Sequence, residues 1–160
     1  MKTDTHQGLA AYFWENPNIT ELEIGHYHDD DLPRLPDSLK RLYIHNSHAF
    51  KTFPPLPNSL ERMRILHCRG VSNLTADLKL SHLVYLEIDL CPGVSEFTAP
   101  RSLEHLVLKN CGGLSSVSIN HWLNIRFVEL VNCRNLTAFY SRRPITSLTV
   151  KNCDLLERKL

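Results

Sequence analysis

The sequence predicts an α/β repeat solenoid dominated by short parallel strands, with a mostly non-helical return side. The pattern apolar-x-x-apolar-x-apolar recurs seven times at intervals of 20 to 23 residues. A cysteine follows three residues after five of these patterns, and prolines gather between the early ones. A period of this length is typical of a solenoid, in which each repeat stacks on its neighbours. The seven patterns open at Ile19, Leu39, Leu60, Leu83, Leu103, Ile125 and Ile145.

Each pattern predicts one short strand. Residues on a strand alternate between its two faces, so the last two apolar positions of each pattern point inward and their neighbours point outward. In the fourth repeat, Leu86 and Ile88 point inward, while Tyr85 and Glu87 point outward. A second apolar pair follows five of the strands and is expected to line the return side of the coil: Phe50/Phe53, Val71/Leu74, Val94/Phe97, Leu114/Val117 and Leu136/Phe139.

The cysteines all fall on one repeat position, which is expected to point inward. Adjacent parallel strands lie about 4.8 Å apart, so disulfides between layers are one interpretation. The preferred interpretation is a structural column of buried, reduced thiols, which predicts a reducing compartment. Asn46, Asn110, Asn132 and Asn152 stand one residue before this position, where stacked amides are expected to form a structural ladder. The cysteines of the column are Cys68, Cys91, Cys111, Cys133 and Cys153.

The two ends of the chain are expected to differ from the repeats. Residues 1–18 predict an N-terminal cap, a short helix whose Leu9, Tyr12, Phe13 and Trp14 cover the first layer and which Pro17 ends. The repeats occupy residues 19–156, and residues 157–160 form a minimal C-terminal cap or tail. Without such a cap, the last strand would be an exposed edge.

The repeats resemble the leucine-rich repeat over roughly residues 19–156. Segments LPRLPDSL (32–39) and FPPLPNSL (53–60) are similar to repeats of bacterial secreted effectors. CGGLSSV (111–117) and CRNLTAF (133–139) are more similar to repeats of plant intracellular immune receptors. The resemblance implies a horseshoe whose concave sheet binds a protein, in immunity or in host–pathogen interaction. It further implies that the cysteine side chains hydrogen-bond the backbone where it leaves each strand.

Composition gives no reason to expect nucleic acid or a membrane as the partner. The 18 basic and 17 acidic residues balance, so no bulk charge favours a polyanion or an anionic membrane. No apolar run is long enough to span a membrane, and the first residues lack the pattern of a secretory signal. We therefore expect a cytoplasmic protein, which the resemblance extends to an effector that a bacterium delivers into a host cytosol.

The outward strand positions carry the candidate partner-binding residues. Tyrosine and arginine are enriched in protein-binding hot spots, because each combines a large contact area with directed polar groups. The alternative is that aromatic residues are present here only because they favour strands. We predict non-catalytic recognition of a protein, without a cofactor, through Arg41, Tyr43, Arg62, Arg64, Tyr85, Glu87, His105, Phe127 and Glu129.

Two other function classes remain open. The loop at 26–31 combines His26 and His28 with Asp29, Asp30 and Asp31, and such groups can bind a transition metal for structure or catalysis. A solvated loop is the preferred interpretation, because no second ligand cluster is apparent. Alternatively, the chain is a self-assembling repeat unit that is a monomer or a weak edge-to-edge dimer. The sequence contains no Cys-x-x-Cys pair, Gly-rich phosphate loop or nucleophile elbow, and we expect no catalytic residue.

Overall fold

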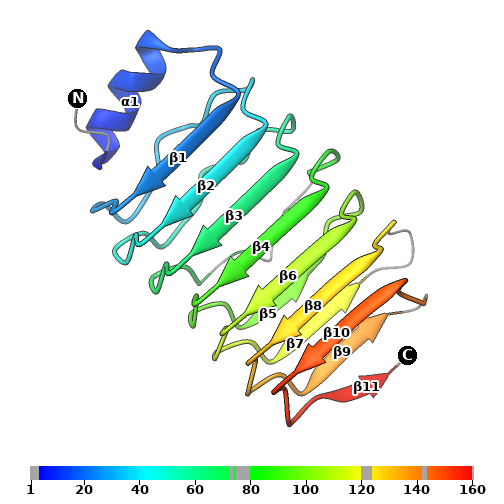
Figure 1. Ribbon diagram of the computed structural model, residues 1–160. Coiled ribbons are helices and arrows are strands. Elements are labelled where there is room, and N and C mark those ends of the chain that lie inside the picture. Colours follow the sequence, from blue (N-terminus) through cyan, green and yellow to red (C-terminus); the bar gives the residue numbers. More distant parts are fainter. Residues whose placement is uncertain (1–3, 73, 75–79, 120–123, 142–143, 160) are drawn as a thin grey trace.

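The computed structural model describes residues 4–72, 74, 80–119, 124–141 and 144–159. These residues form one short helix and a strand-dominated β-solenoid, in which every repeat adds a strand to a long parallel sheet (Figure 1). This sheet has seven strands in the order β1 (Glu21–Gly25), β2 (Arg41–His45), β3 (Arg62–Leu66), β4 (Tyr85–Asp89), β6 (His105–Lys109), β8 (Phe127–Val131) and β10 (Ser147–Lys151).

The return side of the coil carries a second parallel sheet, which the sequence analysis does not anticipate. It contains four strands in the later repeats, in the order β11, β9, β7 and β5. The prolines of the early repeats fit this distribution, because proline has no N–H to donate to a sheet ladder. The strands span β5 (Glu96–Thr98), β7 (Ser116–Ile119), β9 (Ala138–Ser141) and β11 (Glu157–Lys159).

A continuous core runs between the two sides of the coil. The inward residues of the long sheet are almost fully buried, as Ile44, Leu86 and Leu106 illustrate, which confirms the predicted alternation. The second apolar pairs also line the core, except that Phe53 is only partly buried. Among the described residues, no helix is long and apolar enough to cross a membrane.

The cysteine column is confirmed as a row of free, buried thiols. Each Sγ lies near the carbonyl that ends its own strand and near a carbonyl of the preceding repeat; Cys111 Sγ is 3.2 Å from Lys109 O and 3.7 Å from Ile88 O. A hydrogen bond with the neighbouring thiol of Cys133, together with burial, raises the pKa of Cys111. The same contact, with Cys111 as the partner, lowers the pKa of Cys133 to about 7. Each thiol of the column thus lies where it can donate a weak hydrogen bond to strand-end carbonyls.

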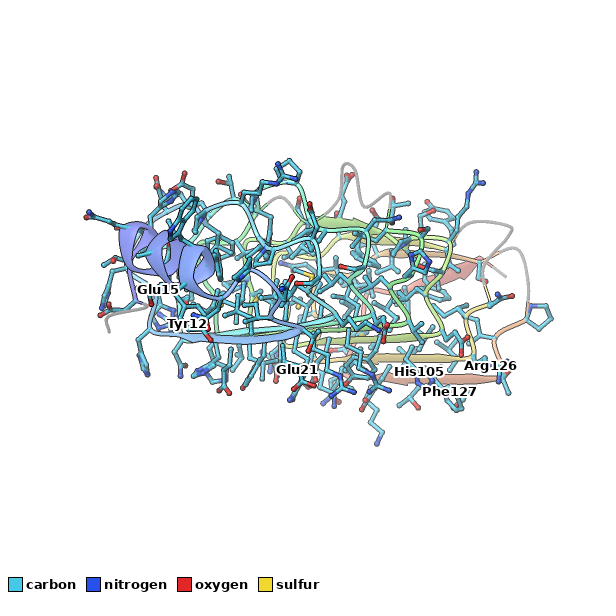
Figure 2. The ribbon with its side chains drawn as sticks, turned by 90° about the horizontal axis from the view of Figure 1, so that it is seen from above. Tyr12, Glu15, Glu21, His105, Arg126 and Phe127 are labelled. Carbon is cyan, nitrogen blue, oxygen red and sulfur yellow. The ribbon has the colours of Figure 1, made fainter. Side chains whose placement is uncertain are left out.

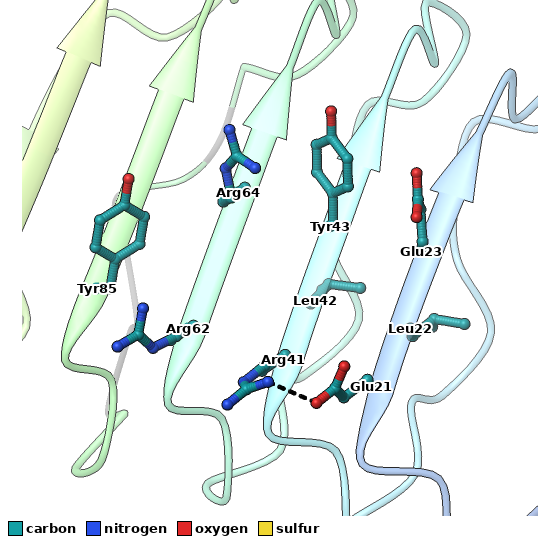
Figure 3. A pocket seen from close by; sticks show the side chains of 9 residues that line it. All are labelled: Glu21, Leu22, Glu23, Arg41, Leu42, Tyr43, Arg62, Arg64 and Tyr85. Carbon is teal, nitrogen blue, oxygen red and sulfur yellow. Dashed lines mark hydrogen bonds and ion pairs between the residues drawn. The ribbon is translucent and has the colours of Figure 1, made fainter.

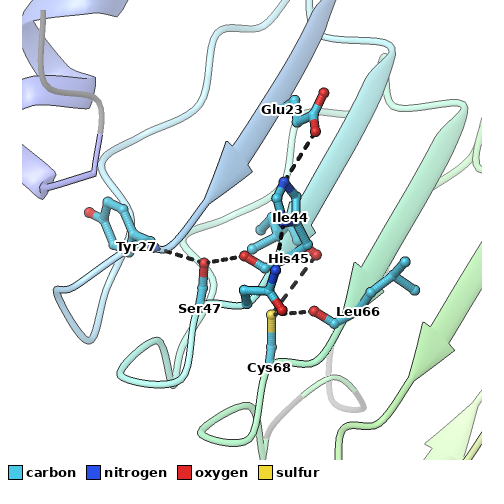
Figure 4. Close-up of polar contacts among 8 residues, drawn as sticks. Glu23, Tyr27, Ile44, His45, Ser47, Leu66 and Cys68 are labelled. Atoms are coloured by element: carbon cyan, nitrogen blue, oxygen red, sulfur yellow. Dashed lines mark hydrogen bonds and ion pairs between the residues drawn. The ribbon is translucent and has the colours of Figure 1, made fainter.

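A serine takes the place of cysteine in the second repeat. Ser47 is fully buried; its Oγ accepts a hydrogen bond from Tyr27 N at 3.0 Å and donates to His45 O at 3.0 Å (Figure 4). In the next layer, Cys68 Sγ lies 3.3 Å from Leu66 O. The Ser47 hydroxyl and the Cys68 thiol thus occupy the same repeat position, and each contacts the carbonyl at the end of its own strand.

Helix α1 (His6–Glu15) lies beside β1 at the N-terminal end of the solenoid (Figure 1). Its Thr5 Oγ1 accepts a hydrogen bond from Gly8 N at 3.2 Å, which caps the first turn. Leu9 and Phe13, one turn apart on the same face, are buried. Trp14 was expected to cover the first layer, and this is wrong, because its side chain is 88% exposed. The next residue along a helix is rotated by about 100°, which places Trp14 away from the core face.

The C-terminal end is less covered. Leu148 and Val150 of β10 are only partly buried, and Leu155 is 56% exposed. Glu157–Lys159, expected as part of a cap or tail, forms β11 and pairs in parallel with β9. These residues therefore extend the return-side sheet, while β10 ends the long sheet.

Candidate functional site

The outward residues of the seven-stranded sheet form one continuous surface, here named the sheet face. The parallel register aligns equivalent repeat positions without a slip, so Arg41 pairs with Arg62, and Arg62 with Tyr85. The same row continues through His105 to Phe127. Viewed from above, Glu21, His105 and Phe127 lie along the same side of the solenoid (Figure 2). Regular repeat spacing thus brings residues that are distant in sequence onto one surface.

Arginine and tyrosine side chains dominate the part of the sheet face over β1 to β4. They line a hollow of about 620 Å³ (Figure 3). We name this the arginine–tyrosine subsite, after Arg41, Tyr43, Arg62, Arg64 and Tyr85. Its lining consists of Glu21, Leu22, Glu23, Arg41, Leu42, Tyr43, Arg62, Arg64 and Tyr85.

Glu87 anchors one side of this subsite. Arg64 donates from Nε to Glu87 Oε2 at 2.6 Å, and the Tyr85 hydroxyl donates to the same oxygen at 3.1 Å. The Arg64 guanidinium lies 5.0 Å from the centre of the Tyr43 ring, a distance at which cation–π attraction operates. The hydrogen bond to Glu87 raises the pKa of Arg64, while burial and then the Glu87 charge raise the pKa of Tyr85. Arg64 is therefore a fixed cation, and Tyr85 remains a neutral phenol.

The other two arginines differ in their partners. Arg41 donates from one terminal nitrogen to Glu21 Oε1 at 2.6 Å. Arg62 instead lies with its guanidinium carbon 5.8 Å from the centre of the Tyr85 ring. Within the described ranges, no carboxylate oxygen lies within 4.0 Å of an Arg62 nitrogen. Arg62 is thus the one arginine of this subsite whose charge has no carboxylate partner in the described structure.

Aromatic side chains dominate the other part of the sheet face. His105 and Phe127 stack with their ring centres 4.6 Å apart and their planes 20° from parallel. Phe127 remains 44% exposed, although it is large and apolar. We name this stacked pair the aromatic shelf. It borders a second hollow of about 270 Å³, lined by His105, Leu106, Val107, Phe127, Val128, Glu129, Ser147 and Thr149.

The nine predicted binding residues all lie on the sheet face. Five of them form the arginine–tyrosine subsite, Glu87 anchors it, and His105, Phe127 and Glu129 line the second hollow. Glu129 is paired with Lys109 at 3.1 Å. Sequence reasoning did not select Glu21 and Glu23, which also line the first hollow. Their place in the same outward columns as Arg41 and Tyr43 was the signal that could have identified them.

The histidine- and aspartate-rich loop at 26–31 is tied to the N-terminal cap. His6 Nδ1 lies 3.2 Å from Asp31 Oδ1, and His28 Nε2 lies 3.9 Å from Asp4 Oδ2. In the part of the chain that the structure describes, no three His, Cys, Asp or Glu side chains gather as a metal site would require. The contacts of this loop therefore join helix α1 to the first repeat.

Chemically, the sheet face offers guanidinium and ammonium ions, carboxylates, imidazoles, hydroxyls and aromatic rings, all of which can contact a ligand. Every cysteine thiol faces inward and is buried. Comparison with known proteins adds no further assignment: no family model, no curated protein and no solved structure matches the chain.

Proposed function

We propose that the protein is a non-catalytic recognition module that binds a protein partner through the sheet face. The observation that supports this most directly is the exposure of arginine and aromatic side chains on regular, paired strands. Phe127 and Arg62 are exposed and contribute nothing to the core, because the core is built from the opposite face of each strand. Such side chains typically dominate the energy of protein–protein interfaces.

The rigidity of the surface favours binding. Each side chain of the sheet face stands on a strand with neighbours on one or both sides, so little backbone is left to be ordered on association. Cross-strand contacts such as Arg64–Glu87 also hold side chains in place before a partner arrives. Because ordering costs reduce affinity, a preorganised surface retains more of its contact energy.

We further propose that the repeats are of the leucine-rich type and that the sheet face lies on the concave side of a horseshoe. The recurring apolar pattern and the single long-sheet strand per repeat support this. The proposed setting is immunity or host–pathogen interaction in a cytoplasm, including a host cytosol reached by a bacterial effector. The file of unpaired thiols fits a reducing compartment.

A double substitution of Arg64→Ala and Tyr85→Ala tests the proposed function. We expect the variant to lose partners that the wild-type chain captures from cell lysate, as measured by quantitative mass spectrometry. Truncation of each hot-spot residue costs about 2 kcal/mol or more of binding energy, so the double variant should bind at least a hundredfold more weakly. The melting temperature should change little, because both side chains point away from the core.

The matched control is Arg34→Ala with Trp14→Ala. It also removes one arginine and one large aromatic side chain, both highly exposed and both outside the sheet face. The control should capture the same partners as the wild type. If the sheet-face variant captures them equally well, the proposed function is wrong.

A further inference from the structure

We infer that the segment bound on the sheet face is an extended, acidic stretch of the partner protein that crosses the strands. It places a carboxylate over Arg62 and, about four residues away, an apolar side chain on the aromatic shelf. This inference rests on the proposed function and specifies the chemistry of the partner.

The charge requirement follows from the pairing of the charged residues on the sheet face. Arg41 is paired with Glu21, Arg64 with Glu87, and Lys109 with Glu129. The two remaining carboxylates of the sheet face are also engaged, because Glu23 Oε1 lies 3.1 Å from His45 Nε2 and Asp89 accepts from Asn110 at 2.7 Å.

Among the described residues, Arg62 and Lys151 are the two cations of the sheet face without a carboxylate within 4.0 Å; Lys151 lies on the terminal strand β10, and Arg62 lies inside the sheet on β3. Its neighbour Arg64 uses Nε for Glu87, and within the described residues its two terminal nitrogens form no hydrogen bond. A guanidinium presents five N–H donors in a planar fork that matches a carboxylate. Donors of the two arginines therefore face the same hollow, where an acidic side chain complements the charge and a basic one would be repelled.

The apolar requirement follows from the aromatic shelf. Phe127 is exposed and stacked on His105, and Val107 lines the same hollow. The carboxylate of Glu129, which lines the same hollow, is paired with the Lys109 ammonium, so the charges of these two side chains offset each other. Burying an apolar side chain here removes exposed ring surface from water at little polar cost.

The geometry of the sheet sets the distance between the bound carboxylate over Arg62 and the bound apolar side chain on the aromatic shelf. From β3, which carries Arg62, to β8, which carries Phe127, the order β3, β4, β6, β8 contains three steps. At about 4.8 Å per step, the separation is about 14 Å. An extended chain rises about 3.3 Å per residue, so this distance corresponds to about four residues. Residues four apart on an extended chain also face the same side, as simultaneous contact demands.

Selection from a phage-displayed library of random dodecapeptides on the full chain tests this inference. We expect enrichment of Asp or Glu four residues from Phe, Tyr, Trp or Leu, in either order. A synthetic peptide of the selected sequence should bind about tenfold more weakly to Arg62→Ala, and to Phe127→Ala, by fluorescence anisotropy. Selection on Arg62→Glu should shift the enriched residue to Lys or Arg. Binding to Arg34→Ala should match the wild type.

The possible outcomes separate the inference from the proposed function. Peptides that need Phe127 but show no acidic enrichment, or show it at another spacing, overturn the inference and leave the proposed function intact. Peptides indifferent to every sheet-face substitution contradict both. An absence of selected peptides overturns the inference alone, since capture of a folded partner remains measurable. Light scattering that shows a dimer dispersed by Arg62→Glu makes a second copy the occupant and also overturns the inference.

Discussion

At the scale of single residues, the position directly after each long-sheet strand has the most demanding backbone conformation. Its φ lies between 51° and 56° in every repeat, the left-handed region, and no glycine occupies it. Asparagine adopts this region more readily than most residues. Four repeats have asparagine at this position. The amides of three of them form a ladder, from Asn152 to Asn132 and from Asn132 to Asn110, at 2.8 Å each. Asn46, which was expected in the same ladder, instead lies with its amide nitrogen 3.2 Å from His45 Nδ1.

Leu90 occupies the same position without these advantages. Its φ is 53°, and its side chain is 40% exposed. Because leucine has no amide, the ladder stops here, and Asn110 donates to the carboxylate of Asp89 instead. A left-handed conformation costs an ordinary L-residue about 1–2 kcal/mol. The sequence predicted the ladder from its asparagines, but the strain at Leu90 could not be predicted because no local pattern marks a leucine as left-handed.

Replacing Leu90 with asparagine should therefore stabilise the protein. We expect Leu90→Asn to raise the free energy of unfolding by about 0.5–1 kcal/mol, because it relieves part of the backbone cost. Urea denaturation followed by circular dichroism measures the change. Leu155→Asn is the matched control, since Leu155 is also exposed but has no positive φ. Equal effects of the two substitutions would show that removal of an exposed leucine, not backbone strain, is responsible.

At the scale of elements, the corners between the sheets depend on close backbone approach. A Cβ added at Gly113 would collide with the carbonyl oxygen of Pro92 in the preceding repeat, whereas one added at Gly112 would meet nothing within 4 Å. A Cβ added at Gly93 would likewise collide with the carbonyl oxygen of Val71. These corners pack backbone on backbone, and a side chain there would force the layers apart.

The adjacent glycines give a controlled experiment on layer spacing. Gly113→Ala should lower the free energy of unfolding by about 1–3 kcal/mol, the usual cost of overpacking a closely packed site. Gly112→Ala should be neutral or slightly stabilising, since alanine restricts the unfolded chain more than glycine does. Thermal unfolding of both variants measures the difference. A tolerated Gly113→Ala would mean that the corners relax easily and do not fix the distance between repeats.

Elements differ in how far the sequence could predict them. The long-sheet strands followed from the spacing of residues such as Leu86 and Ile88, because inward packing requires that alternation. The second sheet did not, since Phe97 and Val117 indicate burial on the return side but not whether their backbones pair. Trp14 was misplaced because an apolar run does not state which residues of a short helix face the core.

At the scale of the whole molecule, the candidate site is a product of stacking. The outward columns were predictable, since a fixed period forces equivalent positions into register. The pairing within them was not, because Arg64 could have met either Tyr43 or Glu87, and rotamers decide that it meets both. Because Glu87 pairs with Arg64, it is not available to Arg62, which is left without a carboxylate partner. These contacts join different repeats, so they exist only once the layers are stacked.

Stacking also makes stability depend on the position of a layer. Leu106 lies in β6, which has β4 and β8 as neighbours, and it is fully buried. Leu148 is partly buried and lies in β10, which among the described strands pairs only with β8. In a solenoid, each layer gains its stability from its interfaces, so a loss in the middle weakens both neighbours.

Alanine substitution at these two leucines measures that dependence. Leu106→Ala should cost about 2–5 kcal/mol of the free energy of unfolding, the range for a fully buried leucine. Leu148→Ala should cost clearly less, because its cavity opens toward solvent and touches one neighbouring layer. In hydrogen exchange, Leu106→Ala should speed exchange of amides in β4 and β8, while Leu148→Ala should affect the last layers only. Equal costs, or exchange that rises uniformly along the chain for both variants, would mean that the solenoid unfolds as one indivisible unit in which the ends are no weaker than the middle.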